Sequence, residues 1–281
     1  MITLKLAPGS QSVIFSEIPY EPRKKTFLIP STYLRESGVL SDRDVLVLFC
    51  RGQFAKQMEF MADEVMNKGS YGWILGSPGI GKSSTAFAFL TSRLDDTGWI
   101  FTWMYFDSAQ VLCVRFNNNQ RKERRFSYRE VSVLQDYLDE DSADDKKHFV
   151  FLDGYVGFGS NSAKIISVAD ECEIWLLKNR ETRRLCILCS MSSRGKTKLD
   201  DDRRKKVMVH RVSSWVSEEY HLAFAQRKIR ECFGRYLDAG FGDKSATDDT
   251  EQLVESKVYF AGGCARYLFA YKTEDVIKDL R

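Results

Sequence analysis

One short run of the sequence combines the residue types that bind phosphate groups. Residues 76–83 read GSPGIGKS and match the pattern G-x-x-x-x-G-K-[ST] in full. The glycines let backbone N–H groups approach phosphate oxygens where a Cβ would collide, and they adopt the positive φ values that such a loop needs. Lys82 offers a compact positive charge to the β- and γ-phosphates, and the Ser83 hydroxyl is a ligand for Mg2+. The run predicts a Walker A loop, or P-loop, that binds ATP or another nucleoside triphosphate with Mg2+.

The flanks of this loop support the same interpretation. A helix that begins near Lys82 would point its N-terminal N–H groups and its positive dipole end at the same phosphates. A glycine-rich turn with a stray lysine is the alternative, and a strand before the loop with a helix after it disfavours that alternative. The residues that we expect to hold the nucleotide are Gly76, Ser77, Pro78, Gly79, Ile80, Gly81, Lys82, Ser83 and Ser84.

A second acid for the metal ion follows the apolar run of residues 148–152. Asp153 ends this run, which is entered from the acidic stretch 139–147. A buried strand with a carboxylate at its C-terminal tip is typical of the Walker B motif, whose acid orders Mg2+ through a water molecule. An ordinary strand-end cap is the alternative. Given the P-loop upstream, we predict that Asp153 joins Ser83 at the metal and Lys82 in catalysis.

The base that would activate water is not identified by the sequence. Many P-loop ATPases place a glutamate after the Walker B aspartate, whereas Gly154 follows here. Asp107 is one candidate for the base, with an ordinary turn residue as the alternative. Glu171 and Glu173 are weaker candidates. We therefore expect hydrolysis to be slow, on the order of 1 s⁻¹ or less.

The elements that must position these residues follow from hydrophobic periodicity. Apolar residues recur at helical spacing over 51–67, which predicts an amphipathic helix. A short apolar strand at 71–75 precedes the loop, and residues 83–94 predict a helix after it. A strand or hairpin within 99–116 and strands at 184–190 and 206–212 complete a parallel sheet flanked by helices, with the nucleotide at the carboxyl ends of its strands.

The remaining segments complete a three-part organisation. Residues 1–44 mix short alternating stretches with turn residues and predict an irregular N-terminal segment. Residues 45–215 form the P-loop NTPase core of an α/β fold. Residues 216–281 are helical, with helices expected at 217–237 and 250–260, and form a C-terminal lid. Ser190, Ser192 and Ser193, at the polar end of the strand at 184–190, would either hydrogen-bond the γ-phosphate or attacking water or form a serine-rich loop.

Composition excludes several other classes of protein. The chain has 281 residues, 43% of them hydrophobic, and a net charge of +3, which favours a globular fold that is not basic all over. No apolar run approaches the ~20 residues of a membrane span, and the first residues lack a signal-peptide core. Seven scattered cysteines fit reduced thiols in a reducing intracellular compartment, and the C-x-x-C of Cys186 and Cys189 lies in a strand-like run rather than at zinc-finger spacing. The basic runs 121–125 and 203–206 are either solvated loop charge or functional patches.

Four segments together resemble a known family. LGSPGIGKSS, FLDG, RVSSW and AGGCARYLFAYKTEDVIKDL are similar to the P-loop domain of Crinkler effectors and retrotransposon hot spot proteins, which are STAND- or AAA-like ATPases. The resemblance covers about residues 45–281. It implies that Arg266 is a catalytic lid arginine that senses the γ-phosphate, and it implies nuclear action and contact with DNA. The nuclease-like domain and ubiquitin-like header of such proteins are not seen in this chain, and neither is an LFLAK-type translocation motif.

These observations favour one function over two others. We expect an ATP-binding module that hydrolyses ATP slowly with Mg2+ and uses the cycle to change its lid or its assembly. A nucleotide-dependent switch without turnover is the alternative that Gly154 supports. A small-molecule kinase is disfavoured by the strand at 184–190 and the C-terminal lid. The expected partners are the nucleotide, DNA beside a nuclease-like domain outside this chain, and further copies of the chain, but no membrane.

Overall fold

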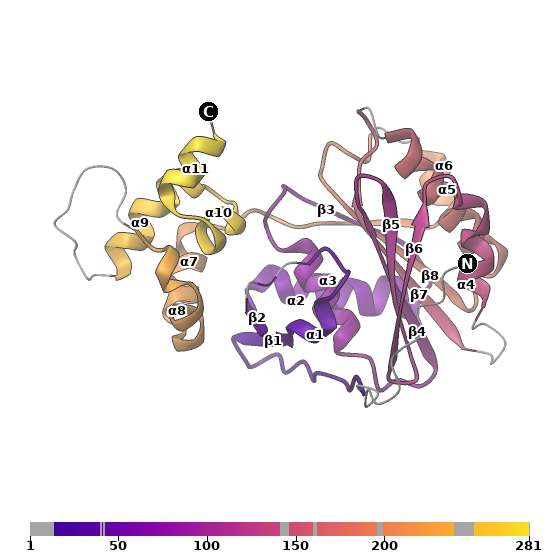
Figure 1. Cartoon of the computed structure of the whole chain (residues 1–281), viewed down its shortest axis with the longest axis horizontal. Coiled ribbons are helices and arrows are strands. Elements are labelled where there is room, and N and C mark those ends of the chain that lie inside the picture. Colours follow the sequence, from indigo (N-terminus) through magenta and orange to yellow (C-terminus); the bar gives the residue numbers. More distant parts are fainter. Residues whose placement is uncertain are drawn as a thin grey trace.

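The computed structural model of this chain describes residues 14–39, 41, 43–140, 146–159, 162–195, 199–238 and 250–280. Its main body is a seven-stranded mixed sheet with helices on both faces, and a group of C-terminal helices lies at one side of it (Figure 1). The predicted α/β class, a mostly parallel sheet flanked by helices with further helices at the C-terminus, is therefore confirmed.

The large sheet has the strand order β6-β5-β4-β7-β8-β3-β9. Its strands are β3 (Tyr71–Leu75), β4 (Trp99–Phe106), β5 (Gln110–Asn117), β6 (Gln120–Ser127), β7 (Lys147–Tyr155), β8 (Arg183–Cys189) and β9 (Val207–Arg211). Strands β4, β7, β8, β3 and β9 run parallel to one another, so their carboxyl ends meet at one edge. The strands predicted before and after the loop are confirmed, and β4 and β5 form the antiparallel hairpin expected within 99–116.

Strand β6 was not predicted, because its sequence QRKERRFS carries charge instead of an apolar face. The run 121–125 therefore lies on an edge strand and not in a loop. Edge strands commonly carry charged side chains, which discourage pairing with other chains. All three arginines of this run form ion pairs, Arg121 with Glu123, Arg124 with Glu140 at 2.6 Å and Arg125 with Glu36 at 2.6 Å.

Each face of the large sheet is covered by its own helices and its own buried cluster. On one face lie α2 (Gly52–Phe60), its continuation as the π-helix η1 (Met61–Asn67), and α3 (Lys82–Thr91). On the other face lie η2 (Val131–Val133), α4 (Leu134–Asp139) and α5 (Ser162–Lys178). The predicted helix over 51–67 is confirmed, with its second half π-helical. No helix among the described residues is both long and apolar enough to cross a membrane.

The second basic run follows three acidic residues on α6 (Leu199–Arg204). Arg204 lies 3.1 Å from Asp201, and Arg194 lies 2.8 Å from Asp202. The acidic residues therefore neutralise much of the local positive charge.

The N-terminal segment is not wholly irregular, and the prediction for it is wrong over residues 26–34. Strand β1 (Thr26–Pro30) pairs antiparallel with β2 (Val45–Phe49), and the short helix α1 (Ser31–Leu34) follows β1. The alternation of these strands was hard to see, because both of their faces are apolar. Phe27 and Ile29 belong to the cluster of the core, whereas Leu28 and Val47 belong to the cluster of the C-terminal helices. The hairpin therefore lies between the core and the C-terminal helices and contacts both. The division of the chain at residues 44 and 215 stays a prediction.

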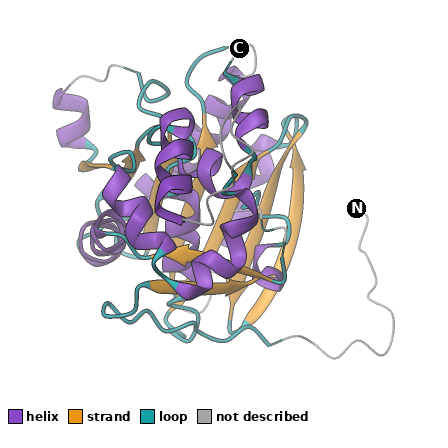
Figure 2. Cartoon of the chain, turned by 90° about the vertical axis from the view of Figure 1, so that its left-hand side faces the viewer, coloured by secondary structure: helices purple, strands orange, loops and turns teal. Residues whose placement is uncertain are grey.

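The C-terminal helices form a separate layer that faces the viewer in Figure 2. They are α7 (Ser217–Phe224), α8 (Arg227–Phe233), η4 (Gly234–Tyr236), α9 (Thr250–Ala261), α10 (Ala265–Ala270) and α11 (Thr273–Asp279). The single helix predicted over 217–237 is wrong in detail, because Gln226 is extended and separates α7 from α8. The helix predicted at 250–260 is confirmed as α9. Helix α8 packs against strand β2 of the hairpin.

Candidate functional site

The loop of residues 76–83 joins β3 to α3 at the carboxyl edge of the sheet. Gly79 and Gly81 have φ angles of 75° and 100°, which L-residues rarely adopt. Gly76 is required for a different reason. A Cβ at Gly76 would lie 2.6 Å from Ile80 Cδ1 and 2.7 Å from the Val212 carbonyl oxygen. The three glycines therefore follow from backbone conformation and close contact, as the sequence pattern predicts.

The carbonyl groups at the start of the loop are bound by the loop's own lysine. Lys82 Nζ donates to the carbonyl oxygens of Gly76 at 2.9 Å and Ser77 at 2.8 Å. Lys82 is buried, with 9% of its surface exposed, and burial lowers the pKa of its ammonium group. The nearby carboxylate of Asp153 opposes that shift. A buried cation held by neutral carbonyls would gain from an anion placed beside it.

The next carbonyl groups are bound by the C-terminal part of the chain. The Gly79 carbonyl accepts from the backbone N–H of Arg266 at 3.0 Å, and the Ile80 carbonyl accepts from the indole N–H of Trp215 at 3.2 Å. With Lys82, these contacts turn four carbonyl groups of the loop toward protein partners.

The backbone N–H groups of the loop differ from its carbonyl groups in their hydrogen bonding. Among the described residues, the backbone N–H groups of Gly79, Ile80, Gly81 and Lys82 have no hydrogen-bond acceptor. They stand at the N-terminus of α3, where the helix dipole adds positive potential. Consecutive donors of this kind, with a buried ammonium beside them, form a binding site for an anion with several oxygens.

Ser83 and Asp153 meet at the end of this loop, although they are 70 residues apart. Ser83 Oγ donates to Asp153 Oδ1 at 2.7 Å. Burial raises the pKa of Asp153 from 3.8 to about 6, and the hydrogen bond from Ser83 and the charge of Lys82 oppose the shift. A hydroxyl and a carboxylate at this separation are oxygen ligands of the type that Mg2+ prefers, either directly or through water.

Asp153 does not lie at the tip of its strand. β7 continues to Tyr155, with a register shift between Asp153 and Tyr155 against β8. Gly154 occupies this irregularity with a φ of 83°. A glutamate in its place would need a backbone conformation that side-chain-bearing residues rarely adopt. The absence of the usual glutamate therefore has a structural basis.

The other candidate bases lie away from the loop or are held by neighbours. Glu171 and Glu173 lie on α5, which covers the face of the sheet opposite to α3. Lys205 pairs with Glu173, and Gln135 donates to Glu171. These positions contradict a role for either glutamate as the base. Asp107 accepts from the Ser108 N–H at 2.7 Å in the turn between β4 and β5, which fits the turn residue that was the alternative.

Strand β8 lies between β3 and β7, so its carboxyl end lies between the loop and Asp153. Cys189 ends this strand. Burial raises the pKa of the Cys189 thiol to about 12, and the positive charge of the nearby Lys82 opposes that shift. Ser190, Ser192 and Ser193 bond one another, with oxygen separations of 3.0 and 2.6 Å from Ser190. These serines form a closed turn, and their predicted contact with a γ-phosphate stays a prediction.

Two glycines explain how Arg266 reaches the loop. Gly262 has a φ of 54°, and a Cβ at Gly263 would lie 2.5 Å from Ser214 Cβ. The turn between α9 and α10 can therefore pass close to the segment before α7. It places Cys264 and Arg266 directly on Gly79, where an added Cβ would lie 2.4 Å from the Cys264 sulfur and 3.1 Å from Arg266 Cβ.

Sequence reasoning missed one residue that supports the loop. Gln57, on α2, is 1% exposed, and its side-chain amide donates to the Lys82 carbonyl oxygen at 2.8 Å. A polar residue on the apolar face of the predicted helix was the available signal. Gln57 thereby ties α2 to the first turn of α3, which also carries Ser84.

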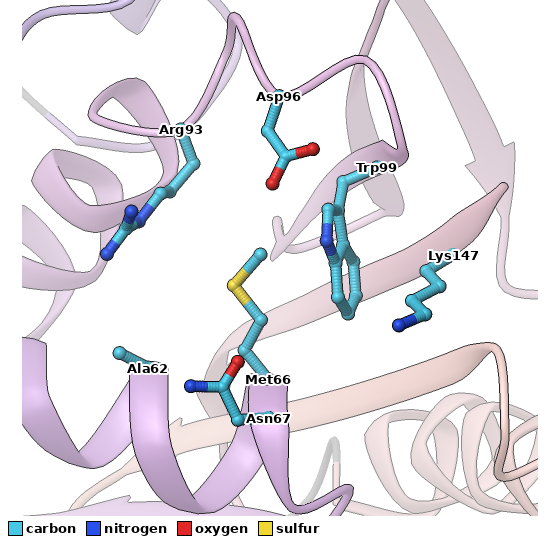
Figure 3. A pocket seen from close by; sticks show the side chains of 7 residues that line it. All are labelled: Ala62, Met66, Asn67, Arg93, Asp96, Trp99 and Lys147. Atoms are coloured by element: carbon cyan, nitrogen blue, oxygen red, sulfur yellow. The ribbon is translucent and has the colours of Figure 1, made fainter.

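Neither thiols nor a metal-ligating cluster add a second site. All seven cysteines are free, and Cys186 and Cys189 are buried on β8, as the core interpretation predicts. No group of three histidine, cysteine, aspartate or glutamate side chains suited to a metal occurs among the described residues. A pocket of about 310 Å³ lies at the opposite, amino edge of the sheet, between Arg93, Trp99 and Lys147 (Figure 3).

Comparison with known proteins gives no family, and the similarity to solved structures is distant. No protein family and no curated protein matches the sequence. C. elegans PCH-2 aligns over 91% of this chain and 75% of its own, with 14% identity and a TM-score of 0.45. Two complexes of S. cerevisiae Hsp104 also align. The complex with ADP covers 76% of this chain and 28% of its own, with 15% identity and a TM-score of 0.41. The complex with casein, in an extended conformation, covers 83% and 36%, with 13% identity and a TM-score of 0.42. This chain spans only about a third of Hsp104, and similarities this low do not identify an activity.

Proposed function

We propose that this chain binds ATP with Mg2+ at the loop of residues 76–83. One observation carries the proposal: within the part of the chain that the structure describes, four carbonyl groups of the loop have protein partners, while the N–H groups of four consecutive residues from Gly79 have none. Backbone donors without acceptors are costly unless a ligand or water satisfies them. A polyphosphate supplies the oxygens that these donors and the Lys82 ammonium need. In the bound state Lys82 would exchange two neutral carbonyls for the β- and γ-phosphates, which is a stronger, charge-assisted contact.

Ser83 and Asp153 would hold the metal ion. Mg2+ neutralises developing negative charge on the phosphates when it is bound. The Ser83 hydroxyl would turn from Asp153 toward the ion, and the ionised carboxylate of Asp153 would hold the ion directly or through water. Ligation requires the ionised carboxylate, so binding releases a proton from Asp153 at pH values below about 6.

We further propose that hydrolysis is slow. No carboxylate follows Asp153, and both glutamates of α5 lie on the other face of the sheet. A switch without turnover is the second candidate function, and the φ of 83° at Gly154 is the observation that favours it. In both cases Arg266 would contact the γ-phosphate, because its backbone is bonded to Gly79 and its charge acts on Asp153 and Lys82.

The wider role that we propose rests on the sequence resemblance alone. The motifs of residues 75–84, 151–154, 211–215 and 261–280 are similar to those of Crinkler-type effectors. This likeness supports a module of a larger effector that acts in the nucleus near DNA and assembles with further copies of itself.

Titration with fluorescent ATP and a phosphate-release assay test the proposal together. Lys82→Ala should weaken ATP binding at least tenfold, a loss of about 1.4 kcal/mol, while circular dichroism shows an intact fold. Wild-type turnover should be about 1 s⁻¹ or less. Equal affinity of Lys82→Ala and wild type would remove the P-loop assignment. Binding without any phosphate release would select the switch over the ATPase.

A further inference from the structure

Trp215 occupies the junction between the loop and the C-terminal helices. It lies between β9 and α7, and its indole N–H donates to the Ile80 carbonyl at 3.2 Å. Its backbone N–H donates to the Gly263 carbonyl at 3.2 Å. One residue therefore bonds both the loop and the turn that places Arg266.

The Trp215 ring is also part of the cluster of the C-terminal helices. It stacks on Tyr220 with 5.0 Å between ring centroids and meets Phe269 edge-on at 5.3 Å. Phe49, at the end of β2, approaches it at 6.0 Å. A shift of these helices would therefore displace the indole, and the indole N–H would lose the Ile80 carbonyl.

Arg51 fixes this junction from the side of the core. It is buried, and its guanidinium carbon lies 5.0 Å from the centre of the Trp215 ring. It donates to the carbonyl oxygens of Ser213 at 2.6 Å and Ser214 at 3.3 Å, and it pairs with Glu219 on α7 at 2.7 Å. These contacts hold the segment before α7 in one conformation, so the indole has a defined place rather than a flexible one.

We propose that Trp215 is a positioning residue that couples the conformation of the P-loop to the seating of the C-terminal helices. This inference rests on the proposed function and adds its regulation. A nucleotide that orders the loop fixes the Ile80 carbonyl and so favours the seated helices. By thermodynamic linkage, seated helices must raise nucleotide affinity by the same factor. The backbone contact from Arg266 to Gly79 is the second bond that depends on this seating.

Hydrogen exchange of the full-length chain, with and without Mg2+ and the slowly hydrolysed analogue ATPγS, tests the coupling. In the wild type, the analogue should slow exchange in peptides covering residues 262–270. Trp215→Phe keeps an aromatic ring beside Tyr220 and Phe269 but removes the N–H donor together with part of the ring area. It should lower ATPγS affinity about fivefold, which corresponds to one hydrogen bond of about 1 kcal/mol. At a saturating concentration of ATPγS, this variant should also show no slowing of exchange in the peptides covering residues 262–270.

Two further variants separate coupling from general destabilisation. Arg51→Lys keeps a cation near Glu219 but lacks the planar fork that reaches Ser213, Ser214 and Glu219 together, so it should lower affinity about two- to threefold with partial loss of the slowed exchange. Trp99→Phe, at the opposite edge of the sheet, should leave affinity and exchange unchanged. If the wild type binds ATPγS and Trp215→Phe keeps the full slowing of exchange, the coupling is overturned and the proposed function is not. If the wild type does not bind the analogue, both fail.

Discussion

Two polar regions of this chain, one in the core and one at the P-loop, are built in opposite ways. Beneath α4, a cluster of Thr102, Arg115 and His148 forms a closed chain of hydrogen bonds. Arg115 Nε donates to Thr102 Oγ1 at 3.1 Å, and the Thr102 hydroxyl lies 2.8 Å from His148 Nε2. His148 Nδ1 lies 3.1 Å from the Leu138 carbonyl oxygen, so Nδ1 carries the proton and Nε2 accepts. At the P-loop, by contrast, four backbone donors find no acceptor among the residues that the structure describes, and burial raises the pKa of the Asp153 carboxyl group.

The difference separates polar groups that stabilise the fold from polar groups arranged for a ligand. Closed networks in a core are retained for stability and specificity, whereas unmatched donors reduce stability until something binds them. Substitutions in the two regions should therefore have opposite signatures, in unfolding free energy beneath α4 and in ligand affinity at the loop.

The largest expected effect is on stability beneath α4. Arg115 is 1% exposed and also donates to the Tyr137 carbonyl at 2.7 Å. Arg115→Ala should lower the free energy of unfolding by about 3 kcal/mol or more, because several buried acceptors lose their donor. Urea denaturation measures this change. Arg124→Ala, which removes an exposed ion pair on the neighbouring strand, is the matched control and should cost at most about 1 kcal/mol. Equal losses in the two variants would contradict the distinction.

The next effect concerns ligand discrimination at the loop. Arg266→Ala should weaken ATP binding tenfold or more and leave ADP binding nearly unchanged, because only ATP offers a γ-phosphate to the guanidinium. Arg266→Lys should recover part of the loss. Competition titrations with both nucleotides measure the ratio. A surface role for Arg266 would instead shift stability by at most ~0.5 kcal/mol and leave both affinities equal.

Asp153 and His148 should give the ligand-free protein opposite dependences on pH. The folded pKa of Asp153, about 6, exceeds its usual 3.8, so the ionised carboxylate destabilises the fold above pH 6 and this penalty disappears as pH falls. Burial and the nearby Arg115 hold the pKa of His148 well below 6.5. The neutral imidazole therefore contributes its full stabilisation of the fold above pH 6.5, and this contribution is lost as pH falls. Asp153→Asn should therefore raise the free energy of unfolding at pH 7.5 by about 1 to 3 kcal/mol.

Denaturation at pH 7.5 and pH 5 measures both dependences. The gain from Asp153→Asn should shrink at pH 5. His148→Gln should cost stability at pH 7.5 and lessen the loss that the wild type suffers on acidification. Asp153→Asn destabilising the ligand-free protein at pH 7.5 would contradict this account.

The smallest effect is expected at the pocket of the amino edge. Arg93 and Lys147 line it, and both side chains are exposed. Arg93→Ala should change neither ATP affinity nor stability by more than about 0.5 kcal/mol. A larger change in affinity would show that this edge is coupled to the loop.

The sequence predicted the parts of the fold whose periodicity and spacing are local. The strand, loop and helix around residues 76–83 follow from glycine conformation and apolar runs. The contact between Asp153 and Ser83, which are 70 residues apart, was predicted from the Walker B motif and not from their separation in the sequence. Strand β6 was missed because an edge strand needs no apolar face. The hairpin of β1 and β2 was missed because each of its faces meets a different cluster, which removes the alternation of polar and apolar residues.

The contacts that hold the loop and the segment before α7 could not be predicted. Trp215 and Arg51 are about 160 residues apart and meet only through tertiary structure, and nothing local to either residue marks the contact. The same holds for Gln57, whose role is visible only once α2 lies against α3. Long-range hydrogen bonds to backbone groups leave no pattern in a single sequence.

The Mg2+ dependence of ATP affinity tests the central claim most directly. ATP titrations of the wild type and Asp153→Asn, each with Mg2+ and with EDTA, give four dissociation constants. Mg2+ should tighten ATP binding to the wild type at least tenfold, and Asp153→Asn should lose most of that gain while its affinity in EDTA stays within about threefold of the wild type. The same Mg2+ dependence in both proteins would contradict the assignment of Ser83 and Asp153 as the metal site and with it the proposed function of the loop.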